Sequence, residues 1–125
     1  MDVKTKFTIS VDHLIARIDF YIAPTVSDLL AAVQSIMTSS HYNSGLRLLI
    51  VDHGTDFDLH ESQLQELIKR QAPQLKAFKS CAIAVLKEHQ YGIARKASSH
   101  LLHEGISLGA FKDEVAAGVW LLGHA

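Results

Sequence analysis

Residues 46–52 read LRLLIVD, a nearly unbroken apolar run that ends in an acid. Such a run is typical of a central strand in a parallel sheet, because helices on both faces of the sheet bury both sets of side chains. Turn-forming residues bound the run on both sides, with SSHYNSG at residues 39–45 and DHGTDFD at residues 52–58. The sequence therefore predicts a buried strand in the middle of an α/β domain.

The chain before this strand predicts a β-hairpin and a helix. Residues 7–11 and 14–20 alternate apolar and polar side chains, as strands with one buried face do, and Asp12-His13 forms the turn between them. Pro24 and Thr25 then signal the start of a helix. Its apolar residues recur at steps of three and four, as in an amphipathic helix: Val26, Leu29, Leu30, Val33, Ile36 and Met37.

The chain after this strand predicts a second helix and a second buried strand. Asp58 and Glu61 have the spacing of a capping box, with Asp58 as the N-cap. Pro73 marks the expected limit of the helix, since a proline removes a backbone donor. Residues 80–86 form the next predicted strand.

The C-terminal part predicts a helix, a strand and a closing helix. The third helix covers residues 90–103 and stops at Gly105, a natural C′ residue. Residues 106–111 form the last strand, and Asp113 opens the final helix. The apolar residues of that helix are Val115, Ala116, Val119, Trp120 and Leu122.

The resulting order, β-β-α-β-α-β-α-β-α, predicts an α/β fold with about five strands and four helices. Strands that alternate with helices imply right-handed crossovers and a mostly parallel sheet, to which the first strand is added antiparallel. One face of the sheet collects bulky residues: Leu46, Leu48, Ile50, Cys81, Ile83, Val85, Ile106 and Leu108. The opposite face carries smaller ones, which allow a helix or another subunit to approach closely: Arg47, Leu49, Val51, Ala82, Ala84 and Gly109.

Length and composition restrict the class of protein. The chain has 125 residues, the size of one domain, so residues 1–125 are interpreted as a single domain. The net charge of −1 argues against nucleic-acid binding. No apolar run reaches the roughly 18 residues that a bilayer requires, so no stable membrane insertion is expected. The N-terminus lacks an apolar signal region and the single cysteine, Cys81, fits a reducing compartment, so a cytoplasmic location is predicted.

Several short segments together resemble bacterial SpoIIAA-like proteins of the STAS superfamily. Residues 81–86, CAIAVL, are followed by YGIAR at residues 91–95, and a strand ending in Phe111 is followed by Asp113. Ala116 or Ala117 then precedes Trp120-Leu121, as in the ending of that family. The strand that ends at Asp52 and the helix around Asp28-Leu29-Leu30 also lie where the family has them.

The resemblance implies a SpoIIAA-like fold and a regulatory role. STAS domains are mostly non-enzymatic and bind partner proteins, nucleotides or lipids. The anti-sigma-factor antagonists among them carry a phosphorylatable serine just after the strand that corresponds to residues 46–52. Here Thr55 is the hydroxyl-bearing residue in that loop, which departs from the Asp-Ser-Ser-Gly type of motif.

The candidate site lies in the loops at the carboxyl ends of the strands, where open parallel sheets bind ligands. The residues expected there as a ligand or partner site are Tyr21, Asp52, His53, Thr55, Lys87, His89, Tyr91 and Arg95. Asp52 and His53 are the nearest approach to an acid/base pair, but adjacent residues of a strand point to opposite sides. We therefore predict no catalytic residue.

Metal and nucleophile chemistry are not predicted either. His100 and His103 are three positions apart on a predicted helix, but a zinc site needs three or four ligands, so a solvated helix face explains them. Cys81 lies in a predicted central strand, where a free cysteine is an inert core residue. No cofactor-binding motif is found, and we expect neither a metal nor a cofactor.

Three functions remain as alternatives. The first is a non-enzymatic binding or regulatory module, not an enzyme, with a second copy of the chain as a homodimer or another protein as its partner. The second is a carrier that holds a lipid-like apolar small molecule between the helices and the sheet. The third is an enzyme that uses Asp52, His53 or His89. A cavity in the core favours the carrier, an exposed apolar patch the regulatory module, and titratable groups in contact in a polar cleft the enzyme.

Overall fold

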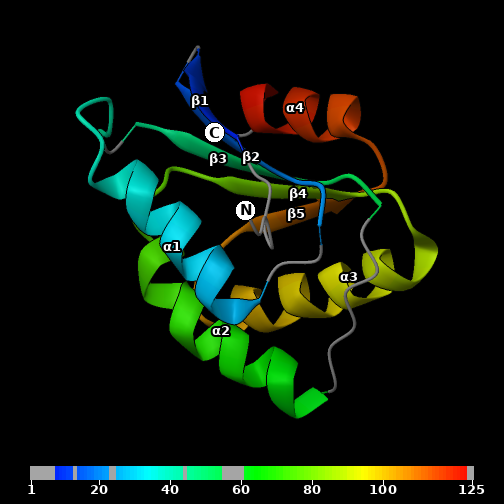
Figure 1. Ribbon diagram of the computed structural model, residues 1–125. Helices are drawn as coiled ribbons and strands as arrows, with labels where there is room; N and C mark the ends of the chain where they lie inside the picture. Colours follow the sequence, from blue (N-terminus) through cyan, green and yellow to red (C-terminus); the bar gives the residue numbers. More distant parts are fainter. Residues whose placement is uncertain (1–7, 13, 23–24, 44, 55–60, 124–125) are drawn as a thin grey trace, which may run out of the picture.

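The fold is an open five-stranded sheet with helices on both faces (Figure 1). The computed structural model describes residues 8–12, 14–22, 25–43, 45–54 and 61–123. Its elements follow the predicted order: β1 (Ile9–Asp12), β2 (Ile15–Phe20), α1 (Val26–Met37), β3 (Arg47–Asp52), α2 (Glu61–Leu75), β4 (Cys81–Val85), α3 (Glu88–His103), β5 (Leu108–Phe111) and α4 (Glu114–Gly123).

The strands lie side by side in sequence order, β1-β2-β3-β4-β5. β1 pairs with β2 antiparallel, and the four other strands are parallel to one another, which confirms the predicted mixed sheet. Figure 1 shows α1, α2 and α3 together on one face and α4 on the other. Each parallel crossover moves one strand further along the sheet, and the three crossover helices share a face.

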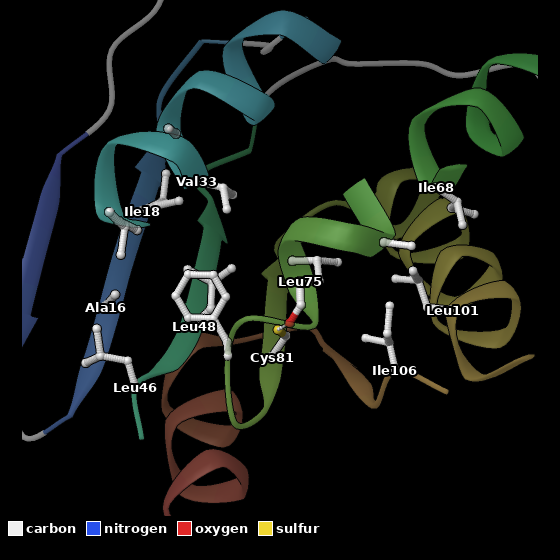
Figure 2. Close-up of a cluster of buried hydrophobic side chains, with 14 of the residues drawn as sticks. Ala16, Ile18, Val33, Leu46, Leu48, Ile68, Leu75, Cys81, Leu101 and Ile106 are labelled. Carbon is white, nitrogen blue, oxygen red and sulfur yellow. Dashed lines mark hydrogen bonds between the residues drawn. The ribbon is translucent and has the colours of Figure 1, made fainter. Parts of the chain in front are cut away.

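The larger core lies between the sheet and α1, α2 and α3 (Figure 2). Leu48 in β3 is fully buried, and Cys81 lies beside it in β4. The other buried members include Ala16, Ile18, Phe20, Val33, Ile36, Leu46, Leu75, Leu101 and Ile106. This is the face for which the sequence predicts the bulky residues.

A smaller core lies under α4. Ala117 and Leu121 are fully buried against a face made of Leu49, Val51, Ala82 and Ala84. Gly109 lies so close to this helix that an added Cβ would be 3.1 Å from the Trp120 ring and 2.7 Å from that of Phe111. The small residues of this face therefore let α4 approach the sheet closely, as the sequence predicts.

The helix ends follow ordinary capping chemistry. Thr25 accepts a hydrogen bond from the Asp28 N–H, and the Asp28 carboxylate accepts one from the Thr25 N–H. Asp113 accepts a bond from the Ala116 N–H and caps α4, as predicted. Gly105, at φ +80°, ends α3 in the left-handed conformation, as a C′ glycine does.

Some predicted boundaries were wrong. α2 continues through Pro73 to Leu75, because a proline near the C-terminus of a helix removes just one bond of the last turns. α3 begins at Glu88, two residues before the predicted start at Gln90. Asp12 belongs to β1, where it pairs with Ile15, so Asp12 is not part of the turn.

The predicted apolar face of α4 was also wrong in part. Val115, Val119 and Leu122 point away from the sheet, and the buried positions are Ala117 and Leu121. Trp120 is half-buried against Phe111. The predicted N-cap Asp58 lies outside the described residues.

Candidate functional site

An apolar cavity opens between the three helices on one face and the sheet. Its volume is about 100 Å³. Twelve residues line it: Ile18, Leu29, Val33, Ile50, Leu67, Ile68, Gln71, Leu75, Ile83, Ala97, Leu101 and Leu108. The cavity is therefore formed by β2, β3, β4 and β5 from below and by α1, α2 and α3 from above.

The cavity exists because the helix layer does not close over the middle of the sheet. Leu48 and Cys81 are 0% and 1% exposed, whereas Ile50 and Ile83, two residues further along the same strands, are half-buried. Leu29 of α1, Leu67 of α2 and Ala97 of α3 are half-buried as well. Apolar side chains of every surrounding layer therefore remain in contact with solvent.

The lining determines which ligands the cavity could hold. Eleven of its twelve residues are apolar, Gln71 is the polar one, and no charged residue takes part. Ions and metals need several oxygen, nitrogen or thiolate ligands, whereas this lining offers one side-chain amide, that of Gln71. A concave lining that is almost entirely apolar favours an apolar ligand over a polar or charged one.

A polar cluster lies on the opposite, α4-facing side of the sheet. The Nε2 atom of His53 is 2.7 Å from the Oδ1 atom of Asp19, and the His53 ring stacks on Tyr21 with 4.4 Å between ring centroids. The Arg17 guanidinium donates to Asp19 through Nη2 at 2.8 Å and to Glu114 of α4 at 3.1 Å. The cluster thus connects β2, β3 and the start of α4.

Asp19 is the centre of this cluster and is 5% exposed. Burial alone would raise the pKa of its carboxyl, but hydrogen bonds from Arg17, His53 and Thr8 together hold the pKa below its ordinary value. The bond to Asp19 in turn raises the pKa of Arg17. The carboxylate is ionised and already accepts three partners, an arrangement that favours a structural role over proton transfer.

The predicted site residues separate into several groups. Tyr21 and His53 come together, but Asp52 is buried on the other face of the sheet, as strand alternation predicts. Tyr91 contacts Arg95, 6.0 Å from its ring centroid, and Lys112, 5.1 Å from it. Lys87 and His89 are exposed beside the N-terminus of α3, and Thr55 lies outside the described residues.

Sequence reasoning missed the residues that hold His53 in place. Asp19 and Arg17 come from β2 and Glu114 comes from α4. The pairing of β2 with β3 brings Asp19 next to Val51, two residues before His53 and on the same face of the sheet. A signal was present, since Arg17 and Asp19 are charged residues at alternate positions of a strand. The sequence placed both as polar positions of a strand with one buried face, because the position of α4 was unknown.

Neither a metal site nor a reactive thiol is found among the described residues. No group of three histidine, cysteine or acidic side chains is placed to bind a metal within the described ranges. His100 and His103 border an open hollow of about 550 Å³ between α2 and α3, together with Glu66 and Lys69. Burial raises the pKa of the Cys81 thiol to about 12, so this thiol stays protonated.

Comparison with known proteins identifies the fold. No family model matches the chain, and no curated protein matches it. The structure is similar to that of an uncharacterized protein from Shewanella loihica PV-4, of the DUF3478 family and with a SpoIIAA-like fold. The TM-score is 0.57 at 18% sequence identity, over 94% of this chain and 93% of that one. The chain therefore has a SpoIIAA-like fold, as the resemblance in its sequence predicts.

Proposed function

We propose that the chain is a non-enzymatic binding module of the STAS type, and that its ligand is an apolar small molecule held between the helices and the sheet. The observation that carries this proposal is the cavity lined by eleven apolar residues and Gln71. Burying a methylene group from water is worth about 0.8 kcal/mol, so a lining without charge suits a hydrocarbon chain or ring.

The size of the cavity limits the ligand in the present conformation. Engineered apolar cavities of about 150 Å³ bind benzene, so the volume of about 100 Å³ here takes a short chain segment or a small ring. A longer molecule requires the helices above the sheet to move apart. The half-buried residues Leu29, Leu67 and Ala97 are those that such a ligand would cover.

The enzyme alternative has weaker support. Asp19 and His53 are titratable groups in contact, but the carboxylate of Asp19 is already bound by Arg17 and Thr8. Asp52 is buried on the opposite face from His53, so these two cannot act as a pair.

Ligand binding can be tested with a variant that fills the cavity. Native mass spectrometry of the gently purified protein would reveal a bound molecule, and a fluorescent naphthylamine probe would report an open apolar site. Ala97→Leu adds three carbon atoms to the lining and should weaken probe binding at least several-fold. Ala31→Leu makes the same change at an exposed position of α1 and should leave binding unchanged. Equal probe binding by both variants, with no molecule retained by the wild type, would contradict the proposal.

Other properties stay predictions. The cytoplasmic location, the absence of nucleic-acid binding and the homodimer rest on the sequence alone. No helix among the described residues is long and apolar enough to cross a membrane. A protein partner is a second candidate, which the exposed apolar residues of α4 favour.

A further inference from the structure

An open polar hollow lies next to the apolar cavity. The hollow lies between α2 and α3 and has a volume of about 550 Å³. Ile68 of α2 is buried, and it lines both the hollow and the cavity. Its neighbours in the chain divide between the two spaces, because Leu67 lines the cavity whereas Glu66 and Lys69 line the hollow. The side chain of Ile68 therefore separates the two spaces.

The hollow is chemically unlike the cavity. Its lining carries charges of both signs, from the ammonium group of Lys69 and from the carboxylates of Glu66 and Glu104. His100 and His103 of α3 add ring nitrogens, each of which donates or accepts a hydrogen bond. A polar space and an apolar space thus meet at one residue, and together they match the two ends of an amphiphilic molecule.

We propose that the ligand is a single-chain amphiphile with an uncharged, hydroxyl-bearing head group, whose head lies in the hollow and whose chain passes Ile68 into the cavity. This inference rests on the proposed function, because the same cavity holds the chain. The cavity volume of about 100 Å³ holds only part of an alkyl chain, so the rest of the ligand must lie outside it. The hollow is the space that continues from the cavity on the far side of Ile68.

The lining of the hollow selects against a charged head group. A carboxylate head would meet Glu66 and Glu104, and an ammonium head would meet Lys69. Like charges placed side by side discriminate against a ligand. A hydroxyl group avoids both repulsions, because it donates a hydrogen bond to a carboxylate and accepts one from an ammonium group. An alcohol or a monoacylglycerol therefore suits this lining better than a fatty acid or an alkylamine does.

The head-group preference can be measured with three ligands that share an eight-carbon chain. Isothermal titration calorimetry at neutral pH would compare 1-octanoylglycerol, octanoate and octylamine. The glyceride should bind roughly fivefold more tightly than either charged ligand. Glu66→Gln should strengthen octanoate binding about threefold, since it removes one of the two opposing carboxylates. Gln63→Lys makes the same change in net charge at an exposed position of α2 outside the hollow, and should leave octanoate binding nearly unchanged.

The route past Ile68 can be measured by stopped-flow fluorescence with the naphthylamine probe. Ile68→Ala joins the hollow to the cavity, so the probe should associate and dissociate at least several-fold faster. Leu29→Ala removes a side chain from the α1 side of the same cavity, and should leave the association rate nearly unchanged. Ile68→Val should show a smaller acceleration in the same direction, which provides the test if Ile68→Ala does not fold. Circular dichroism verifies the fold of each variant.

The possible results separate this inference from the proposed function. If neither the naphthylamine probe nor any of the three ligands bound to the wild type, the proposed function itself would fail. If the probe bound but the three ligands had equal affinities, the head-group assignment alone would be wrong. An association rate that both Ile68 variants leave unchanged would place the entrance elsewhere and overturn the route past Ile68.

Discussion

The Nε2 atom of His53 lies 2.7 Å from Oδ1 of Asp19, although 34 positions separate the two residues in the chain. The pair joins neighbouring parallel strands on the face that α4 covers in part. Arg17 extends the contact to Glu114, so a chain of polar side chains continues the packing of α4 toward β2. At the carboxyl ends of β2 and β3, hydrogen bonds and ion pairs take the place of apolar packing.

Asp19→Asn should destabilise the fold by about 2 kcal/mol at neutral pH, since it weakens charge-assisted bonds to Arg17 and His53. The pKa of Asp19 is held below its usual 3.8. Its ionised form therefore contributes stability that is complete above that value and is lost as the pH falls through the lower, folded value. Urea denaturation at neutral and at acidic pH should show the difference between wild type and variant shrinking in acid.

A second carboxylate provides the control for this pH effect. Glu104 is exposed at the end of α3, and Glu104→Gln should leave both the stability and its pH dependence within about 0.5 kcal/mol of the wild type. If Asp19→Asn behaved in the same way as Glu104→Gln, the cluster around Asp19 would contribute nothing to the stability of the fold.

Gly109→Ala should destabilise the fold by about 1–2 kcal/mol, because the new Cβ would lie 2.7 Å from the Phe111 ring and 3.1 Å from that of Trp120. Gly92→Ala is the matched change at an exposed helical position where a Cβ meets no atom within 4 Å, and it should stabilise α3 by up to about 1 kcal/mol. Thermal melting of the two variants should show shifts of opposite sign. A neutral Gly109→Ala would indicate that α4 can move away from the sheet at little cost.

Thr25→Ala should cost about 1 kcal/mol, because the side chain of Thr25 accepts a hydrogen bond from the Asp28 N–H at the start of α1. Ser27→Ala, at the exposed second position of the same helix, should be neutral or slightly stabilising. Guanidinium denaturation of the pair would measure the contribution of the cap. Equal midpoints would contradict the assignment of Thr25 as the N-cap.

The element order could be predicted because each segment carries its own periodicity. The run at residues 46–52 and the alternation before it depend on local sequence alone, and both became strands. The bulky and small faces of the sheet followed directly, since side chains of a strand alternate. The N-cap at Asp113 and the C′ glycine Gly105 were equally local signals.

The candidate site was less predictable because it depends on how elements pack together. The contact between Asp19 and His53 requires the register of β2 on β3, which no single segment specifies. The exposed side of α4 was misjudged because Val115 and Val119 are as apolar as the buried Ala117 and Leu121. The cavity arises from the distance between the helix layer and the sheet. The pattern of apolar residues in the sequence does not predict that distance.

The cavity also makes a prediction about stability, independent of any ligand. In a fully packed core, enlarging a side chain costs typically 1–3 kcal/mol, because neighbouring side chains are forced out of their rotamers. In an existing cavity the same change removes apolar surface from water and commonly stabilises by about 0.5–2 kcal/mol. Ala97 lines the cavity, so Ala97→Leu should raise the melting midpoint of the ligand-free protein, while Ala31→Leu on the exposed side of α1 should change it little. If Ala97→Leu instead lowered the melting midpoint, the space above Ile50 and Ile83 would already be filled by protein side chains in solution. That result would contradict the proposed apolar binding site.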